Sequence, residues 1–282
     1  MSNPAVSGWR AAGGFASGLA LLAAALLLAA GAARGEPVVE GAVDQWRHFS
    51  TGRTVEFSGY TWRVKGVDGG EAYGPGGFPF GPTPESVWVD EAGRLHLQVI
   101  QKQGRWYSAE VRLTEALGYG DYRFTTVGRV DDIDPHVIFG LFLWEYVPSY
   151  DEAATRNVAN EFDIEFGNWD DPTRAPAQFV CQPYQVPGAL HPFWFSLPDD
   201  DAKSTHAFRW RPDGVDSRAW RGGPEAETDA EARLTTWTYD GPHVPAGAPQ
   251  LHLNLWCNRQ PPERGVAQEV VIECFEFVPL KQ

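Results

Sequence analysis

Residues 161–166 read Glu161-Phe162-Asp163-Ile164-Glu165-Phe166, with acidic and apolar side chains in alternation. Successive side chains of a β-strand point to opposite faces, so this alternation is typical of a strand with one buried face. The three carboxylates would then share one face, while the three apolar side chains would pack into a core. The stretch predicts a half-buried strand of a sheet, and the rest of the chain is interpreted from it.

The acidic face of this strand has the spacing of a sugar-cleaving site. The Cα atoms of Glu161 and Glu165 would lie about 13 Å apart, and inward leaning of the side chains brings the carboxyls to roughly 6 Å. Retaining glycosidases hold their two carboxyls about 5–5.5 Å apart. The simpler interpretation is a solvated acidic face. Three neighbouring like charges repel one another, however, and this cost favours a functional role for the arrangement. The same crowding raises the pKa of one carboxyl, so that it can act as an acid.

Short runs of alternating, β-branched and aromatic residues recur along the chain. Proline (22 residues) and glycine (30 residues) fall largely between these runs, and no long amphipathic helix is evident. We therefore expect an all-β protein, a sandwich of two sheets with little helix. The segments 66–84 and 222–231 are predicted loops, the first a rim over a binding groove because it carries aromatic residues. The runs are 86–89, 95–100, 121–127, 137–144, 161–166, 178–182, 206–210, 251–256 and 269–277.

The beginning of the chain differs from the rest. Residues 1–35 combine Arg10, an apolar stretch over 19–30 and small residues before Glu36, a pattern that predicts a secretory signal peptide. The alternative is an uncleaved membrane anchor, because small or apolar residues run from 11 to 33. The remaining 36–282 have a suitable length for a single β domain.

The net charge of the chain argues against several classes of binding partner. Without the two arginines of residues 1–35, 21 basic residues stand against 37 acidic ones, a net charge near −16. Such a surface repels nucleic acid and anionic membranes, so we expect neither as a partner. A densely sulfated polysaccharide is also a difficult substrate.

The sequence gives no sign of a metal or cofactor site. Cys181, Cys257 and Cys274 allow at most one disulfide, without indicating the pair, and their spacing excludes a structural zinc site. The acidic segments 199–201 and 222–231 are more typical of solvated turns than of a calcium site. The histidines suggest no Ser/His/Asp or metal constellation; His206 and His252 are interpreted as structural or groove-lining.

The order of several segments resembles glycoside hydrolase family 16, the jelly-roll β-glucanases that include bacterial lichenases. The resemblance covers most of residues 62–279, although only the Glu-x-Asp-x-Glu strand is specific by itself. It implies a concanavalin-like jelly-roll β-sandwich of two antiparallel sheets with a concave substrate cleft. The other matching segments are 89–97, 109–112, 118–122, 141–144, 206–210 and 254–256.

The resemblance also implies roles for residues of the strand. Glu161 corresponds to the nucleophile, Asp163 to its electrostatic helper and Glu165 to the general acid and base. No extra residue precedes the last Glu, so the strand is similar to lichenases and xyloglucan transglycosylases rather than to the bulged Glu-x-Asp-x-x-Glu of typical laminarinases and agarases. The implied substrate contacts are Glu110, Arg112, Phe142, Trp144, Asn254 and Trp256.

Further sugar contacts are predicted from the residues themselves. Sugar rings stack on aromatic side chains, and their hydroxyls bind amides and carboxylates. Gln178 and Gln182, which alternate on the next predicted strand, are therefore candidate hydroxyl partners. Trp169 is a weaker candidate for the groove wall. Each aromatic residue taken alone is more often part of a core.

We thus expect a secreted, extracellular or periplasmic, monomeric and cofactor-free retaining endo-hydrolase of a β-glucan-type polysaccharide. Val180, where lichenases tend to carry Asn, and the divergent segment 215–222 leave the linkage open. A β-glucan transglycosylase is one alternative, because a sugar hydroxyl can replace water as acceptor. A structural envelope protein that keeps the fold without the chemistry is another.

A non-catalytic lectin is the third alternative. Glu161-Phe162-Asp163 followed by Asn168, Asp170 and Asp171 imitates the metal-binding strand of legume-type lectins. No histidine follows nearby, since the next is His191, and a lectin gives no reason for Glu165.

Overall fold

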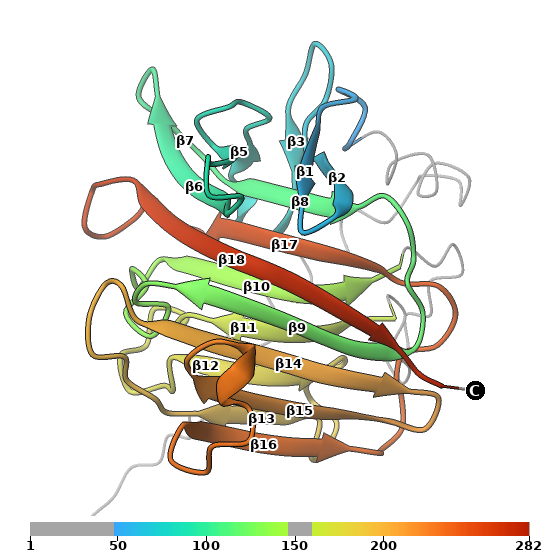
Figure 1. Ribbon diagram of the computed structural model, residues 1–282. Helices are drawn as coiled ribbons and strands as arrows, with labels where there is room; N and C mark the ends of the chain where they lie inside the picture. The colour runs from blue at the N-terminus through green and yellow to red at the C-terminus, as the bar shows by residue number, and fades with distance from the viewer. Residues whose placement is uncertain (1–47, 146–159, 282) are drawn as a thin grey trace, which may run out of the picture.

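The computed structural model describes residues 48–145 and 160–281. The predicted signal peptide lies outside the described residues. Within them the chain forms two eight-stranded antiparallel sheets, stacked one on the other, and a small two-stranded sheet (Figure 1). The prediction of an all-β sandwich is confirmed.

The first sheet carries the strand from which the fold was predicted. Its order places β11 near the middle of one half, between β10 and β12, with β13 at the edge. In sheet order, the strands are β1 (Thr54–Phe57), β2 (Tyr60–Val64), β8 (Ala109–Leu113), β17 (Gln250–Cys257), β10 (Val137–Trp144), β11 (Phe162–Phe166), β12 (Ala177–Cys181) and β13 (Leu190–Phe193).

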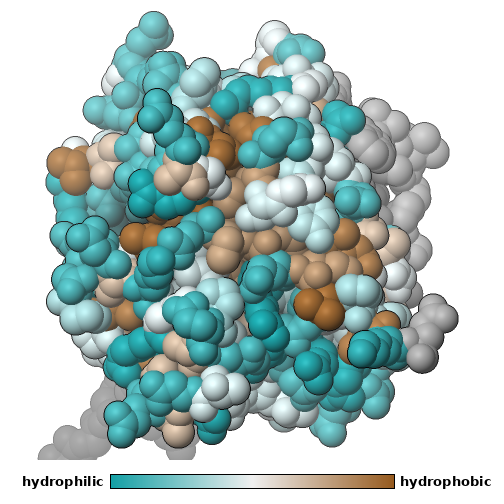
Figure 2. Space-filling view, in the orientation of Figure 1, coloured by the Kyte–Doolittle hydropathy of each residue, from teal (hydrophilic) through white to brown (hydrophobic). Residues whose placement is uncertain are grey.

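The second sheet lies in front of the first in Figure 1. Figure 2 shows its outer side, where hydrophilic side chains surround an apolar area over the middle. In sheet order, the strands are β16 (Arg233–Tyr239), β15 (Gly214–Arg221), β14 (Lys203–Arg211), β9 (Gly120–Val127), β18 (Gln268–Pro279), β6 (Leu95–Lys102) and β5 (Val87–Val89), and β7 (Arg105–Tyr107) pairs with β6.

The core lies between the two sheets and follows the period-two pattern. Phe162, Ile164 and Phe166 of β11 are fully buried there, as the alternation predicted. His206 also points into this core, where its Nε2 lies 2.8 Å from Ser204 Oγ. Burial lowers the pKa of His206 to about 3, so it is a neutral structural residue.

All nine predicted runs are strands, and β10 matches its prediction residue for residue. The sequence missed β1, β2, β7, β8, β13, β15 and β16, most of them short or at the sheet edges, where alternation is weak. The predicted loop 222–231 contains only the short 3-10 helix η2 (Pro224–Ala226).

The predicted loop 66–84 contains β3 (Ala72–Tyr73), η1 (Pro75–Gly77) and β4 (Pro79–Phe80). It packs on the first sheet so tightly that a Cβ at Gly76, which has φ of 78°, would come 1.9 Å from the carbonyl oxygen of Cys257. Only glycine allows this approach.

The described residues contain no disulfide and no helix with the length and apolar character of a membrane span. Cys181, Cys257 and Cys274 are all described, and each is a free thiol. Burial raises the pKa of the Cys181 and Cys257 thiols to about 12, so both remain protonated.

Candidate active site

The three acidic residues lie along a strand of regular pairing. Asp163 is opposite Phe142 of β10 and Val180 of β12, and the register continues unbroken through the strand. Glu161 directly precedes the strand, and its carbonyl oxygen accepts a hydrogen bond from Gln182 N at 3.2 Å. The acids therefore share the side of the first sheet that faces away from the core, called here the carboxylate face.

Two glutamines orient these acids: Gln178 lies in β12, and Gln182 directly follows that strand. Gln178 Nε2 donates a hydrogen bond to Glu165 Oε2 at 2.6 Å, and Gln182 Nε2 donates one to Asp163 Oδ2 at 2.9 Å. Arg174 lies behind the first pair and donates to Gln178 Oε1 at 3.3 Å. The Gln178 amide thus holds the Glu165 carboxyl in place, and Arg174 holds Gln178 in turn.

The carboxyls of the three acids have raised pKa values. Burial, followed by the charge of Glu165, raises the pKa of Glu161 to about 7. Burial also raises the pKa of Glu165 to about 7, against the hydrogen bond from Gln178 and the charge of Arg174. The pKa of Asp163 is raised well above its usual value by burial and by both glutamates. The cluster therefore shares protons near neutral pH, with an acid beside a carboxylate.

The aromatic residues Phe142 and Trp144 of β10 are half-buried on the carboxylate face. Phe142 stacks on His252 of β17 with ring centroids 5.1 Å apart. Gly140, opposite both Glu165 and Asn254, leaves a notch in which a Cβ would come 2.7 Å from Asn254 Oδ1. This close approach lets the Asn254 side chain lie beside the acids.

The predicted contact Trp256 is only 7% exposed. The 66–84 segment covers it at Gly76, and Trp169 meets its ring edge-on, with centroids 5.7 Å apart. Trp169 adopts a positive φ of 58° in the turn after β11. The two tryptophans form one aromatic block beside the acids.

The predicted contacts Glu110 and Arg112 are on the same side of the sheet but are 3% and 0% exposed. Glu110 bonds Lys65 Nζ at 2.8 Å and His252 Nδ1 at 2.9 Å. The Arg112 guanidinium lies 4.7 Å from the ring of Phe49, which covers it. Although burial raises the pKa of Glu110, Lys65 and His252 lower it to about 2. In this structure neighbouring protein groups cover both side chains, and their contact with sugar stays a prediction.

Four contributors to the site were not predicted from the sequence: Phe49, Lys65, Gly140 and Arg174. Lys65 follows a strand, β2, that was not predicted, and Phe49 lies next to the undescribed part of the chain. The spacing Arg174-x-x-x-Gln178 gave no signal, because a turn brings the two together.

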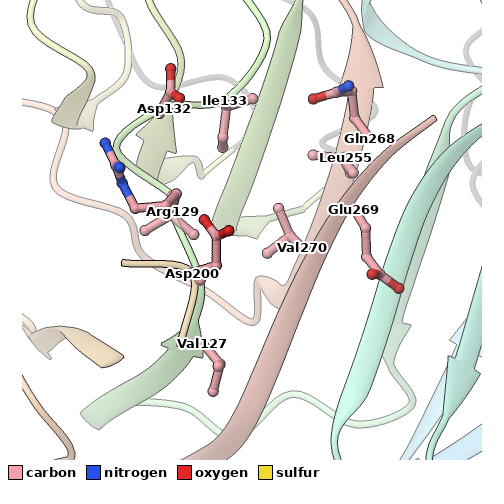
Figure 3. A pocket seen from close by; sticks show the side chains of 11 residues that line it. Val127, Arg129, Asp132, Ile133, Asp200, Leu255, Gln268, Glu269 and Val270 are labelled. Carbon is pink, nitrogen blue, oxygen red and sulfur yellow. The ribbon is translucent and has the colours of Figure 1, made fainter. Parts of the chain in front are cut away.

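A cavity of about 210 Å³ lies away from these acids (Figure 3). The turn after β9 and the start of β18 line it, and no residue of β11 or β12 does. Arg129 and Asp132 line it, but Arg129 pairs with Asp131 at 2.7 Å, and Asp132 pairs with Arg264 at 2.8 Å. We assign no catalytic role to it.

Two of the lectin-like residues, Asp170 and Asp171, are hydrogen-bonded to protein groups. Asp170 Oδ2 accepts a hydrogen bond from Asn258 Nδ2 at 3.1 Å, and Asp171 accepts from Thr173. Within 48–145 and 160–281, no cluster of three His, Cys, Asp or Glu side chains is arranged to hold a metal ion.

Comparison with known proteins was informative only at the level of structure. No family model matches the chain, and no curated protein does. Among solved structures, a Bacillus licheniformis β-glucanase is 17% identical, with a TM-score of 0.51 over 78% of this chain and 92% of that one. A Rhodothermus marinus laminarinase is 16% identical, with a TM-score of 0.50 over 72% and 84%.

A third similar structure is described as an immunostimulatory antigen and pseudo β-1,3-glucanase of Mycobacterium tuberculosis. It is 15% identical, with a TM-score of 0.53 over 78% of this chain and 91% of that one. Identities this low establish the fold and not the activity. The chain therefore has the jelly-roll β-sandwich fold of the β-glucanases, as the family resemblance of its sequence predicted.

Proposed function

We propose that the protein is a secreted, retaining, endo-acting glycoside hydrolase that cleaves a β-glucan-type polysaccharide. The observation that carries the proposal is the regular strand β11 with the residue directly before it: Glu161, Asp163 and Glu165 share one face there, and their carboxyls have raised pKa values. Retaining hydrolysis needs one ionised and one protonated carboxyl at short range, and a proton-sharing cluster supplies both.

The first step forms the glycosyl-enzyme. Ionised Glu161 attacks the anomeric carbon while protonated Glu165 gives its proton to the leaving oxygen, and the glycosidic bond breaks between them. Asp163, steadied by Gln182, modulates the charge on Glu161. Gln178 holds the Glu165 carboxyl in place during the transfer.

The second step releases the sugar. Ionised Glu165 takes a proton from water, whose oxygen attacks the anomeric carbon and displaces the Glu161 carboxylate. Both residues return to their starting protonation states. Phe142 and Trp144 would stack on sugar rings, and Asn254 would bind a hydroxyl. None of these steps uses a cofactor.

The first experiment is a substrate panel of β-1,3-glucan, β-1,4-glucan, mixed-linkage glucan and galactan, with linkage analysis of the products. Glu161→Gln and Glu165→Gln should reduce turnover by orders of magnitude while the protein stays folded. Glu231→Gln, an exposed acid on the second sheet side, is the matched control. Near-normal activity of either active-site variant would overturn the assignment.

Azide rescue distinguishes the two glutamates. With an activated aryl glycoside and Glu161→Gly, azide should attack directly and give a product of inverted anomeric configuration. With Glu165→Gly, azide should intercept the glycosyl-enzyme and give a retained product. The opposite pattern would exchange the roles.

A non-catalytic sugar-binding protein is the second candidate. Two observations favour it: a similar structure is described as a pseudo β-1,3-glucanase, and the predicted contacts Glu110 and Arg112 are buried. Binding to a panel polymer without any release of reducing ends would establish this candidate. Loss of that binding on chelation would indicate the lectin mechanism. Transfer to added oligosaccharides in place of hydrolysis would indicate a transglycosylase.

A further inference from the structure

The edge strand β13 carries side chains toward the same face as the catalytic acids. In the ladder, Pro192 lies opposite Gln178 of β12, which lies opposite Glu165 of β11. These three positions form one row across the sheet, from the acid to the edge. Pro192 is exposed, and a proline ring offers apolar surface without an N–H donor.

Trp194 continues this side of β13 directly after the strand ends. Phe193 before it is 5% exposed, and Phe195 after it packs on Phe193 with centroids 5.7 Å apart. Because side chains alternate in extended backbone, Trp194 points away from the core, toward the carboxylate face. It is 66% exposed, the largest fraction among the exposed large hydrophobic residues described.

The position of Trp194 relative to the acids indicates which end of a sugar chain it meets. β13 runs parallel to β11, so Trp194 lies beyond Glu165 and on the side away from Glu161. Two strand spacings of about 4.8 Å and one residue pair along the strand separate it from Glu165. Glu165 is the residue that protonates the leaving oxygen, so a chain leaving at Glu165 extends toward Pro192 and Trp194.

We propose that Pro192 and Trp194 form a sugar-binding platform for the leaving-group side of the polysaccharide, with Trp194 as the stacking residue. The inference rests on the proposed hydrolase function and adds the part of the substrate that this edge recognises. The apolar C–H faces of a sugar ring suit an exposed indole beside a proline ring. The same platform would hold an acceptor sugar when a glycosyl group is transferred.

The test compares substrates with and without a sugar in the leaving group. Trp194→Ala should raise KM for mixed-linkage β-glucan about fivefold to tenfold, the loss expected for one aromatic stacking contact. Hydrolysis of a 4-nitrophenyl oligoglucoside, whose leaving group is nitrophenol, should be unchanged. Trp194→Phe should retain most polymer affinity. The ratio of transfer to hydrolysis with an added oligoglucoside acceptor should fall in Trp194→Ala.

The control is Tyr184→Ala, which removes a 56% exposed aromatic residue from the turn at the other end of β12 and β13. It should leave both substrates unaffected. Three results would overturn the platform. Trp194→Ala could impair hydrolysis of both substrates equally, it could impair neither, or Tyr184→Ala could show the same selective loss on the polymer. Continued cleavage of the nitrophenyl substrate in each case would leave the hydrolase function standing.

Discussion

Glu165→Gln should make the protein more stable at alkaline pH, although it abolishes the proposed acid. Folding raises the pKa of Glu165 from its ordinary value of 4.5 to about 7 through burial. The folded state thus binds this proton more tightly than the unfolded chain does. The stability that comes from this proton is fully present below pH 4.5 and is lost as pH rises through 7.

The size of the effect follows from the same shift. A rise from 4.5 to about 7, at 1.36 kcal/mol per pKa unit, corresponds to an upper figure of about 3 kcal/mol. Glu165 is half-buried and shares its protons with neighbours, so we expect about 1–2 kcal/mol. For a domain of this size, the melting temperature at pH 8 should rise by about 2–8 °C. The glutamine oxygen can still accept the hydrogen bond from Gln178.

The assay is thermal and urea unfolding of wild type and variant at pH 4, 6 and 8. The two proteins should converge at pH 4 and separate progressively up to pH 8, where the variant is more stable. Glu231→Gln, on the exposed surface, should follow the wild type throughout. The reasoning would be refuted if the stability difference between Glu165→Gln and wild type did not change with pH. It would also be refuted if the variant lost stability relative to wild type between pH 4 and pH 8.

Three further changes test the surroundings of the acids. Arg174→Gln removes a charge that lowers the pKa of Glu165, so the basic limb of the kcat/KM profile should move up by about 0.1–0.7 pH units. Gly140→Ala should cost about 1–3 kcal/mol of stability by melting and reduce kcat, because its Cβ would meet Asn254 at 2.7 Å. Lys65→Met should destabilise by about 3–5 kcal/mol in urea, since Glu110 would stay buried without its cation. An unchanged pH profile of Arg174→Gln would contradict the effect of its charge on Glu165. Wild-type stability of Gly140→Ala or Lys65→Met would contradict the steric or the charge argument, respectively.

Much of the fold was predictable because it depends on a local pattern. The alternation in 161–166 records which side chains face the core, and the observed strand keeps that register. The positions of the three acids on one face follow from the same period of two. The edge strands β1, β13 and β16 were missed because a strand with one neighbour and partial exposure has no strong alternation.

By itself, the sequence determined the strand β11, the shared face of the three acids and the sandwich that buries their apolar neighbours. This was possible because alternate residues of a strand lie on the same face, so the spacing of residues along the chain tells which face each one takes. Only the tertiary structure decided that Phe49 covers Arg112, that Arg174 supports Gln178 and that Trp194 faces outward at the edge. Those contacts join residues whose turns and loops have no fixed period. The positions of these residues depend on how segments distant in the sequence pack together, and no local sequence pattern indicates that packing.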